Sequence, residues 1–248
     1  MVMTAFVMQV QEPAKENGMA VYAISDVHLS LGVSNKAMDV FGPGWANHME
    51  RLQEGWQKTV APEDIVLIAG DISWATYMPD AMGDLLFLHN LPGQKVILRG
   101  NHDYWWSAYG KVRTNLPPSI LAVQNNVVQV GDIHVCGTRG WTSPNMGNFS
   151  EEKDRKLFER EKIRLRLSLK GLKEGEMNLC MLHYPPFTER GDPTEFAEII
   201  AEYPVKKVVY GHLHGKSGYG AFQGMWGNTE YVFSSADCLG FVPKKILD

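Results

Sequence analysis

Five short polar motifs with the chemistry of metal ligands are spread along this sequence of 248 residues, and each follows an apolar run. An unpaired polar group at the end of a buried strand costs free energy unless something binds it. Five of the eight histidines lie in these motifs, so accidental capping of strand ends is disfavoured and a bound metal ion or phosphate is indicated. The motifs are Asp26-Val27-His28, Gly70-Asp71, Gly100-Asn101-His102-Asp103, His183 and Gly211-His212-Leu213-His214.

The ligand types in these motifs are carboxylate or amide oxygens and imidazoles, which suit borderline divalent metals better than calcium or magnesium alone. Seven such ligands are too many for one tetrahedral ion, but they fit two ions that share a carboxylate. Two ions about 3.5–4 Å apart can hold the attacking and leaving oxygens of a phosphoryl displacement. The pattern therefore predicts a dinuclear centre for phosphoryl chemistry.

Buried strands are the elements that would position these motifs. In open α/β sheets, functional sites lie beyond the carboxyl ends of the strands, so the five motifs are expected to converge. Where two ligands are two residues apart, an extended backbone directs both side chains to one side. The apolar runs that lead into the motifs are residues 21–24, 65–69, 95–98, 177–182 and 207–210.

Helices are expected between these strands, and a hairpin turn is expected at Gly131-Asp132 between strands at 127–130 and 133–137. Residues 163–167 alternate in polarity and would also suit a strand, but the length and charge of the surrounding segment favour a helix. Residues 192–195 resemble a capping box. The expected helices span residues 45–60, 104–115, 150–170 and 192–203, and another begins at residue 79.

The composition is that of a folded protein with a sizeable core, with 44% hydrophobic and 21% charged residues. A net charge of −4 disfavours a general nucleic-acid partner. Three unclustered cysteines in apolar runs indicate reduced thiols in a cytoplasmic protein. No apolar run approaches the roughly 18 residues of a membrane span.

Residues 1–18 are expected to be an appendage, and residues 19–248 a single domain.

Taken in order, the motifs Asp-x-His, Gly-Asp, Gly-Asn-His-Asp, His and Gly-His-x-His resemble those of the calcineurin-like metallophosphoesterase superfamily, over nearly all of residues 20–216. The segments Gly70-Asp71-Ile72-Ser73-Trp74 and Tyr104-Trp105-Trp106 are most similar to its small bacterial predicted phosphohydrolases. The resemblance implies an α/β fold, namely a four-layer α/β/β/α sandwich of two mixed sheets with a dinuclear centre at the strand ends.

The resemblance also implies a role for each matched residue. His102 would be catalytic without being a ligand, by stabilising the transition state or protonating the leaving group. A metal-bound hydroxide would attack phosphorus, since coordination brings the pKa of water to about 7. The expected cofactors are two divalent ions, such as Mn, Fe or Zn. One would be held by Asp26, His28 and His214, and the other by Asn101, His183 and His212, with Asp71 as the catalytically essential bridge.

Candidate substrate contacts are Arg139, Trp141 and His48. Arg139 could bind a phosphate bidentately or be an ordinary surface arginine. Trp141 could stack on a base or pack in the core. Asp103 could support His102 or cap the following helix.

The resulting prediction is a phosphoesterase that hydrolyses mono- or diesters of a small phosphorylated substrate such as a nucleotide. A nuclease and a metal-free scaffold of the same fold are the alternatives, and the oligomeric state is left open. A nuclease would need a basic groove, and the intact ligand set disfavours a scaffold. A zinc amidohydrolase fits this sequence less well. Such enzymes carry their His-x-His motif early in the chain, whereas here it comes late, at His212 and His214. Ser/Thr protein phosphatases carry Asp and Arg where this chain has Trp74 and Ala75, so protein phosphatase activity is not expected.

Overall fold

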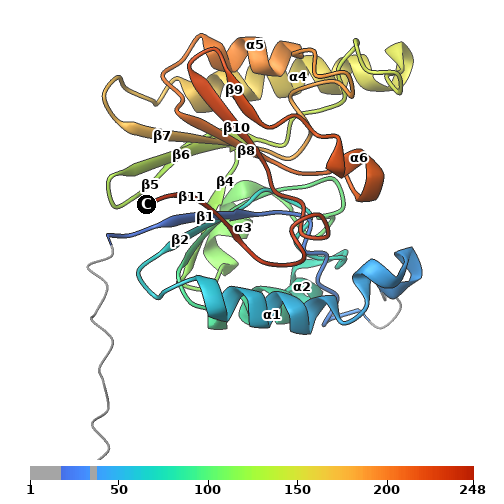
Figure 1. Ribbon diagram of the computed structural model, residues 1–248, viewed down its shortest axis with the longest axis vertical. Coiled ribbons are helices and arrows are strands. Elements are labelled where there is room, and N and C mark those ends of the chain that lie inside the picture. Colours follow the sequence, from blue (N-terminus) through green and yellow to red (C-terminus); the bar gives the residue numbers. More distant parts are fainter. Residues whose placement is uncertain (1–17, 34–37) are drawn as a thin grey trace, which may run out of the picture.

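Two β-sheets, each covered on its outer face by helices, form four layers in the computed structural model, which describes residues 18–33 and 38–248 (Figure 1). The predicted α/β/β/α sandwich of two mixed sheets is confirmed. Apart from Gly18, the predicted appendage at residues 1–18 lies outside the described residues.

The first sheet is mixed because one edge strand runs against the others. From edge to edge it contains β11 (Lys244–Leu247), β1 (Val21–Ile24), β2 (Ile65–Ile68), β3 (Gln94–Leu98) and β4 (Ile120–Val123). Strands β1 to β4 are parallel, and β11 is antiparallel to β1. The edge strand β4 is one that the sequence analysis does not predict.

The second sheet has four parallel strands between two antiparallel edge strands. Its order is β5 (Val127–Val130), β6 (Ile133–Thr138), β7 (Met177–Leu182), β8 (Lys207–Tyr210), β10 (Thr229–Phe233) and β9 (Gly224–Trp226). The predicted hairpin turn at Gly131-Asp132 joins β5 to β6, which confirms it.

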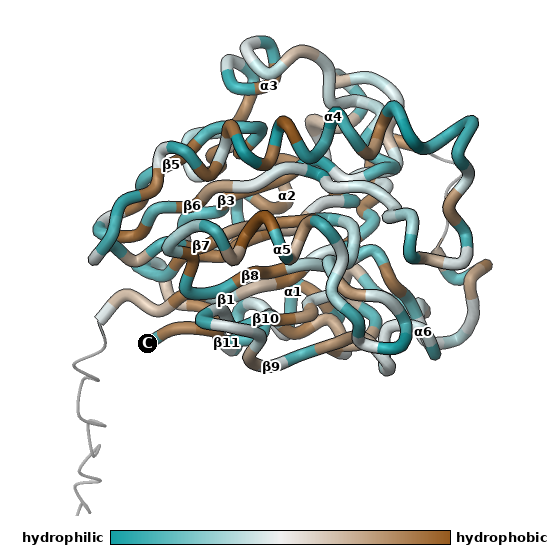
Figure 2. The backbone as a smooth tube through the Cα atoms, turned by 90° about the horizontal axis from the view of Figure 1, so that it is seen from above, coloured by the Kyte–Doolittle hydropathy of each residue, from teal (hydrophilic) through white to brown (hydrophobic). Residues whose placement is uncertain are grey.

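Helices cover the outer face of each sheet. The first sheet is covered by α1 (His48–Thr59), α2 (Met78–Asn90) and α3 (Tyr109–Asn115), and the second by α4 (Glu151–Leu169) and α5 (Glu195–Ala201) (Figure 1). The segment at residues 163–167 is therefore helical, as its length and charge predict. Short helices also occur as α6 (Gly215–Tyr219), η1 (Met38–Phe41) and η2 (Pro43–Trp45). Figure 2 shows α4 and α5 alternating between hydrophilic and hydrophobic residues along their length.

Strand β1 shows why the predicted strands are continuous apolar runs. Val21 and Ala23 face the core between the sheets, whereas Tyr22 and Ile24 face the core beneath the helices. All four residues are buried, because successive side chains of a strand point to opposite faces and here both faces are covered. Burial stabilises the fold by roughly 1.5–3 kcal/mol for each large apolar side chain.

The helix predicted at residues 104–115 is only partly correct, because α3 begins at Tyr109. The preceding segment is irregular. The Trp105 and Trp106 rings are each 1% exposed, and their indole N–H groups donate to Asp103 and Gln124. Packing of the two indoles into the core thus overrides the helical pattern of the sequence.

The capping box predicted at residues 192–195 is wrong. The Thr194 hydroxyl does not cap α5, but donates to the backbone oxygen of Pro186 at 2.8 Å. Pro193 lies before the helix and forms an isolated bridge with Phe187. The residues that resemble a cap therefore anchor the loop after β7.

Candidate metal centre

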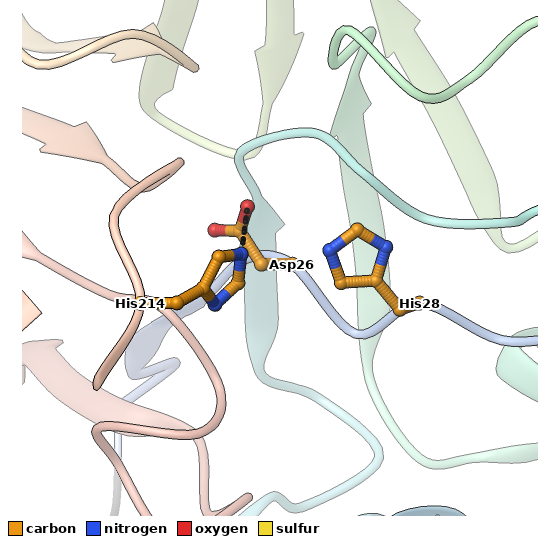
Figure 3. A group of neighbouring side chains, drawn as sticks. All are labelled: Asp26, His28 and His214. Carbon is orange, nitrogen blue, oxygen red and sulfur yellow. Dashed lines mark ion pairs between the residues drawn. The ribbon is translucent and has the colours of Figure 1, made fainter. Parts of the chain in front are cut away.

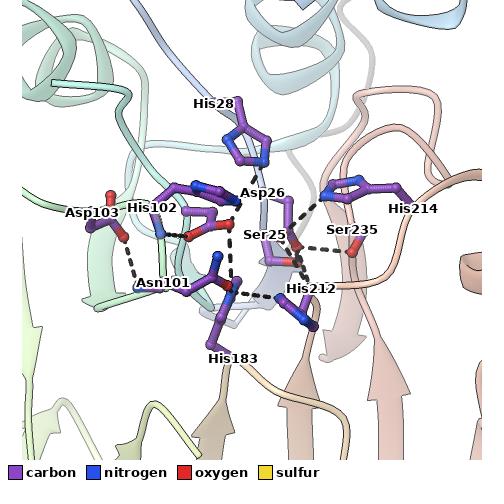
Figure 4. Close-up of polar contacts among 12 residues, drawn as sticks. Ser25, Asp26, His28, Asn101, His102, Asp103, His183, His212, His214 and Ser235 are labelled. Carbon is purple, nitrogen blue, oxygen red and sulfur yellow. Dashed lines mark hydrogen bonds and ion pairs between the residues drawn. The ribbon is translucent and has the colours of Figure 1, made fainter. Parts of the chain in front are cut away.

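Polar side chains that follow the carboxyl ends of five strands, from both sheets, lie together (Figure 4). β1, β2 and β3 contribute from the first sheet, and β7 and β8 from the second. A hydrogen bond between His183 Nδ1 and the backbone oxygen of Ala69, at 3.0 Å, crosses from one sheet to the other. The predicted convergence of the motifs therefore takes place across two sheets rather than along one.

Four of the predicted ligands have a left-handed backbone, with φ of 55° at Asp26, 46° at His28, 52° at Asp71 and 74° at His212. This region is unfavourable for residues with a side chain and is occupied mostly by glycine. Only seven non-glycine residues of the described chain have such a φ, so more than half lie at this site. Such strain typically gathers where side chains must be aimed for function.

Two glycines of the motifs are needed because other groups approach their backbone closely. A Cβ atom on Gly100 would lie 2.1 Å from Asp71 Oδ1, and one on Gly211 would lie 2.2 Å from Asp26 Oδ2. Neither contact is possible, so any larger residue would displace a carboxylate of the site. The glycines thus allow the strand ends to approach closely enough for their polar side chains to meet.

One group of potential ligands consists of Asp26, His28 and His214 (Figure 3). One ligand atom from each of the three lies within 4.8 Å of the others. His214 Nε2 is 3.7 Å from Asp26 Oδ1, and the buried Nδ1 of His28 has no hydrogen-bond partner in the described chain. Two imidazoles and a carboxylate at this spacing form a set that a divalent cation can occupy.

A second group of potential ligands shares Asp26 with the first. Ligand atoms of Asp26, Asp71 and His183 also lie within 4.8 Å of one another. His183 Nε2 is 3.5 Å from Asp71 Oδ2, 2.7 Å from Asn101 Oδ1 and 3.2 Å from His212 Nδ1. The structure therefore brings all seven predicted ligands into one cluster.

Three residues that the sequence analysis did not single out hold the ligands in place. The hydroxyls of Ser25 and Ser235 donate to Asp26 Oδ2, and Asp237 Oδ1 is 3.1 Å from His214 Nδ1. A carboxylate on the second nitrogen of a ligating histidine fixes its orientation and strengthens it as a ligand. Ser235 and Asp237 could have been found from the sequence, because they follow β10 and make it a sixth strand that ends in a polar run.

Asp103 does not cap α3, whose N-cap is Ala108. Its carboxylate makes no hydrogen bond with the His102 ring within the described residues, but its negative charge raises the pKa of that ring, against the larger lowering by burial. Asp103 is buried and accepts hydrogen bonds from the backbone N–H groups of Gly100, Ile72 and Ser73, at 2.7–3.0 Å, and from the Trp105 indole. Asp103 thus ties the loop after β2 to the loop after β3. These are the loops that carry Asp71 and Asn101.

We therefore expect substitution of Asp103 to destabilise the fold. Asp103→Ala leaves several buried N–H donors without an acceptor, and each such loss costs about 1–3 kcal/mol, so the free energy of unfolding should fall by about 3 kcal/mol or more. Asp103→Asn should cost less, because only the Gly100 N–H then faces another donor. Urea unfolding of the metal-free protein measures both variants. The exposed Asp132→Ala serves as the control, and equal stability of all three variants would contradict this role.

Burial keeps most of the imidazoles of the cluster in the neutral form that binds metals. It lowers the pKa of His28 and of His183, and it lowers the pKa of His212, together with the His183 imidazole, to about 2. His214 is the exception. Burial alone would lower its pKa, but the hydrogen bond to Asp237 and the neighbouring carboxylates raise it overall. A metal at this position would thus compete with a proton chiefly at His214.

Asp71 is the carboxylate whose charge most needs a counter-ion. Burial raises its pKa well above the usual range, and the negative charges of Asp26 and Asp103 raise it further. The backbone N–H groups of His102 and Asn101 oppose this shift. A buried carboxylate in this position is stabilised by cations placed next to it, which is the environment that metal ligation would supply.

His102 lies beside the cluster, and its side chain is partly exposed. Its backbone N–H donates to Asp71 Oδ1 at 2.8 Å, but its ring nitrogens make no hydrogen bond within the described chain. The ring centroid is 4.5 Å from that of Trp74 and 5.7 Å from that of His28. Burial and the His183 imidazole lower the pKa of His102. Its ring is thus placed over the cluster without belonging to either group of ligands.

The three candidate substrate contacts lie in different surroundings. Arg139 and Trp141 line a cavity of about 410 Å³ beside the cluster, and the Arg139 guanidinium lies 4.5 Å from the Trp141 ring centroid. His48 is 8% exposed and packs edge-on against Trp45, which in turn contacts the His28 and His214 rings.

The four-layer sandwich and the histidine–carboxylate cluster at its strand ends define a class of protein with a candidate metal centre between two sheets. Within that class, the chain belongs to the calcineurin-like phosphoesterase family, whose sequence model matches residues 19–216. This family match bears out the resemblance of the sequence motifs. None of the helices in the described part of the chain is long and apolar enough to cross a membrane.

One curated protein matches part of this sequence, and two solved structures share the fold. The Gene 66 protein of Mycobacterium phage D29 is 39% identical over 85 residues, a match that covers 34% of this chain and 40% of the phage protein. The phosphopantetheinyl hydrolase of Mycobacterium tuberculosis superposes with a TM-score of 0.57 and 14% identity, over 92% of this chain and 95% of that one. A protein of unknown function from Aquifex aeolicus gives a TM-score of 0.50 and 14% identity, over 92% and 96%.

Proposed function

We propose that this protein hydrolyses phosphate monoesters or diesters of a small substrate at a centre of two divalent metal ions. Asp71 carries this proposal, since its Oδ2 atom lies 3.8 Å from His28 Nε2 and 3.5 Å from His183 Nε2. One carboxylate oxygen thus faces an imidazole of each ligand group. This is the position expected for a ligand that two cations share.

Each group of ligands would hold one ion, with Asp71 contributing to both. Asp26, His28 and His214 are assigned to one ion, and Asn101, His183 and His212 to the other. Mixed imidazole and oxygen donors favour Mn, Fe or Zn. Such ions, when bound, polarise the phosphoryl oxygens and lower the pKa of water to about 7.

The side chain of His102 is proposed to supply the proton. Its ring lies over the ligand cluster, next to Trp74, with both nitrogens available to a bound ester. The lowered pKa makes the protonated ring a stronger acid than an ordinary imidazolium, and a phosphoryl anion beside it would favour the protonated form. His102 can therefore protonate the oxygen of the leaving group as the ester bond breaks.

A hydrolysis screen combined with metal analysis tests this function. The metal-free protein is loaded separately with Mn, Fe and Zn and assayed on phosphomonoesters, phosphodiesters and single-stranded DNA. We expect two ions per chain at saturation and turnover of small esters in preference to DNA. Saturation at one ion would contradict the shared carboxylate, and preferential cleavage of DNA would favour a nuclease.

A further inference from the structure

The cavity beside the metal centre is lined with arginines. It lies at the carboxyl ends of β3, β4 and β6, against one face of α4. Four guanidinium groups line it, from Arg99, Arg139, Arg160 and Arg164, and Glu161 is the single acidic residue of the lining. We call this cavity the arginine pocket. It has the size of a site for a small ligand, since such sites have volumes of about 300–1,000 Å³.

Glu161 neutralises only part of this charge. Its buried carboxylate pairs with Arg164 at 2.6 Å and with Arg139 at 3.7 Å, and accepts a hydrogen bond from Thr138. Arg99 and Arg160 form no ion pair with any described residue. Burial lowers the pKa of Arg139, Glu161 opposes this shift, and the charges of Arg99 and Arg160 lower the pKa further. The pocket therefore gathers positive charge that the described chain does not balance.

Two guanidinium nitrogens in the pocket lack a partner. The Nε atoms of Arg99 and Arg139 are buried and make no hydrogen bond within the described chain. Buried N–H donors are normally satisfied, and an exception calls for a partner such as a water molecule or a bound ion. A guanidinium binds oxyanions through two parallel N–H groups, so unused Nε donors suit a phosphate, sulfonate or carboxylate.

The backbone connects the pocket rigidly to the metal ligands. Arg99 directly precedes Gly100 and Asn101, and the backbone oxygen of Arg139 accepts hydrogen bonds from the N–H groups of His183 and Tyr184, each at 3.0 Å. A group held in the pocket would therefore be fixed in place relative to the metal centre. This is the geometry required to position a substrate by a group remote from the reacting bond.

We propose that the arginine pocket binds a second phosphate group of the same substrate whose ester is cleaved at the metal centre, an inference that rests on the proposed function. The four guanidinium groups exceed the single carboxylate of Glu161 in charge. A bound phosphate, which carries about −1.5 to −2 charges, balances this excess better than a bound carboxylate would. A cavity of about 410 Å³ has room for one small phosphorylated group rather than for a nucleic-acid strand.

Binding of inorganic phosphate to the metal-free protein tests the pocket without using activity. Titration calorimetry compares the wild type with Arg99→Gln, Arg160→Gln and the double variant. Each lost charge-assisted contact should raise Kd by about tenfold, and the double variant by about a hundredfold. Arg113→Gln, an exposed arginine of α3 outside the pocket, removes the same charge and should leave Kd unchanged. Equal Kd values for all of these proteins would overturn the proposal.

Kinetics with the metal-loaded protein then test whether the second group belongs to the substrate. The substrates are bisphosphates of straight-chain diols with three to six carbons. Each is compared with the monophosphate of the same diol and with its phosphocarboxylate, the analogue in which a carboxylate replaces the second phosphate. We expect kcat/KM for the bisphosphate to exceed that for the monophosphate by about 10- to 100-fold at one chain length. The double variant should bring this ratio close to one, and Arg113→Gln should not.

The outcomes separate the two proposals. If no bisphosphate is preferred at any chain length, or if the phosphocarboxylate is preferred, the second-phosphate inference is overturned. If the protein loaded with two metals hydrolyses none of these esters, the proposed function fails, while the phosphate titration still reports on the pocket.

Discussion

Replacement of Asp71 by asparagine is expected to remove at least one metal ion and nearly all hydrolytic activity. A neutral amide cannot bridge two cations as a carboxylate does, and Asp71 Oδ2 faces His28 on one side and His183 on the other. Metal ions typically supply several kcal/mol of transition-state stabilisation, so the rate should fall by about 10³-fold or more. Metal analysis after gel filtration, together with steady-state kinetics, measures both effects.

The same variant should not lose stability when metals are absent. The pKa of Asp71 is raised in the folded protein, chiefly by burial and next by the charge of Asp26, so its ionisation opposes folding as the pH rises above the unfolded pKa. Asp71→Asn removes that cost, and the metal-free variant at pH 8 should melt at or above the temperature of the metal-free wild type. Metal addition should then raise the melting temperature of the wild type by more than that of the variant.

Asp132→Asn makes the same chemical change at an exposed turn, and it should alter neither metal content nor rate. If Asp71→Asn retains two ions and near wild-type turnover, Asp71 is not the bridge. If its metal-free form unfolds at a much lower temperature than the wild type, the carboxylate is a structural group of the apoprotein.

Replacement of His102 by alanine is the second change with a large expected effect. Its ring belongs to neither ligand group, so the variant should keep its metals and its fold while the chemical step slows. General acid catalysis is typically worth about 10²- to 10⁴-fold, and the loss should fall in that range. Metal analysis, thermal unfolding and single-turnover rates separate binding, stability and chemistry.

The size of this loss should depend on the leaving group. A nitrophenolate needs little protonation as it departs, whereas an alkoxide needs much, so His102→Ala should be less impaired on a nitrophenyl ester than on an alkyl ester. An equal loss on both esters would indicate electrostatic stabilisation of the phosphoryl oxygens instead.

His89→Ala, which removes a histidine outside the metal centre, is the control and should leave both rates unchanged. Loss of a metal ion from His102→Ala would make His102 a ligand. The roles of His183 and His212 would then have to be reassigned.

The local sequence was sufficient to predict the five strands that carry the site and the types of its candidate ligands. Each motif directly follows a run such as residues 65–69 or 177–182, whose continuous apolar character specifies a strand that is covered on both faces. In parallel strands, the polar residues that follow must emerge at the carboxyl edge. For this reason Asp26, Asp71 and His183 could be expected to meet although they are far apart in the chain.

Helix starts were predicted less well, because tertiary contacts compete with local preference. The two indoles at residues 105–106 favour burial over helix formation, and the Thr194 hydroxyl bonds to the loop after β7 instead of to its own helix. In both places, a contact with another segment outweighs the local preference for a helix, which contributes only a small free energy.

Only the tertiary structure determined how the site is divided and supported. The ligand strands belong to two sheets, and the bond from His183 to Ala69 spans 114 residues. Asp103 and Asp237 act through backbone and imidazole groups of distant segments, which no spacing within one motif reveals. The arginine pocket likewise combines Arg99 and Arg139 with two arginines of α4, a segment whose charges resemble an ordinary solvated helix face. The physical reason is that a sequence pattern reports the burial of each segment by itself, whereas the partner of a buried charge is decided when the segments pack.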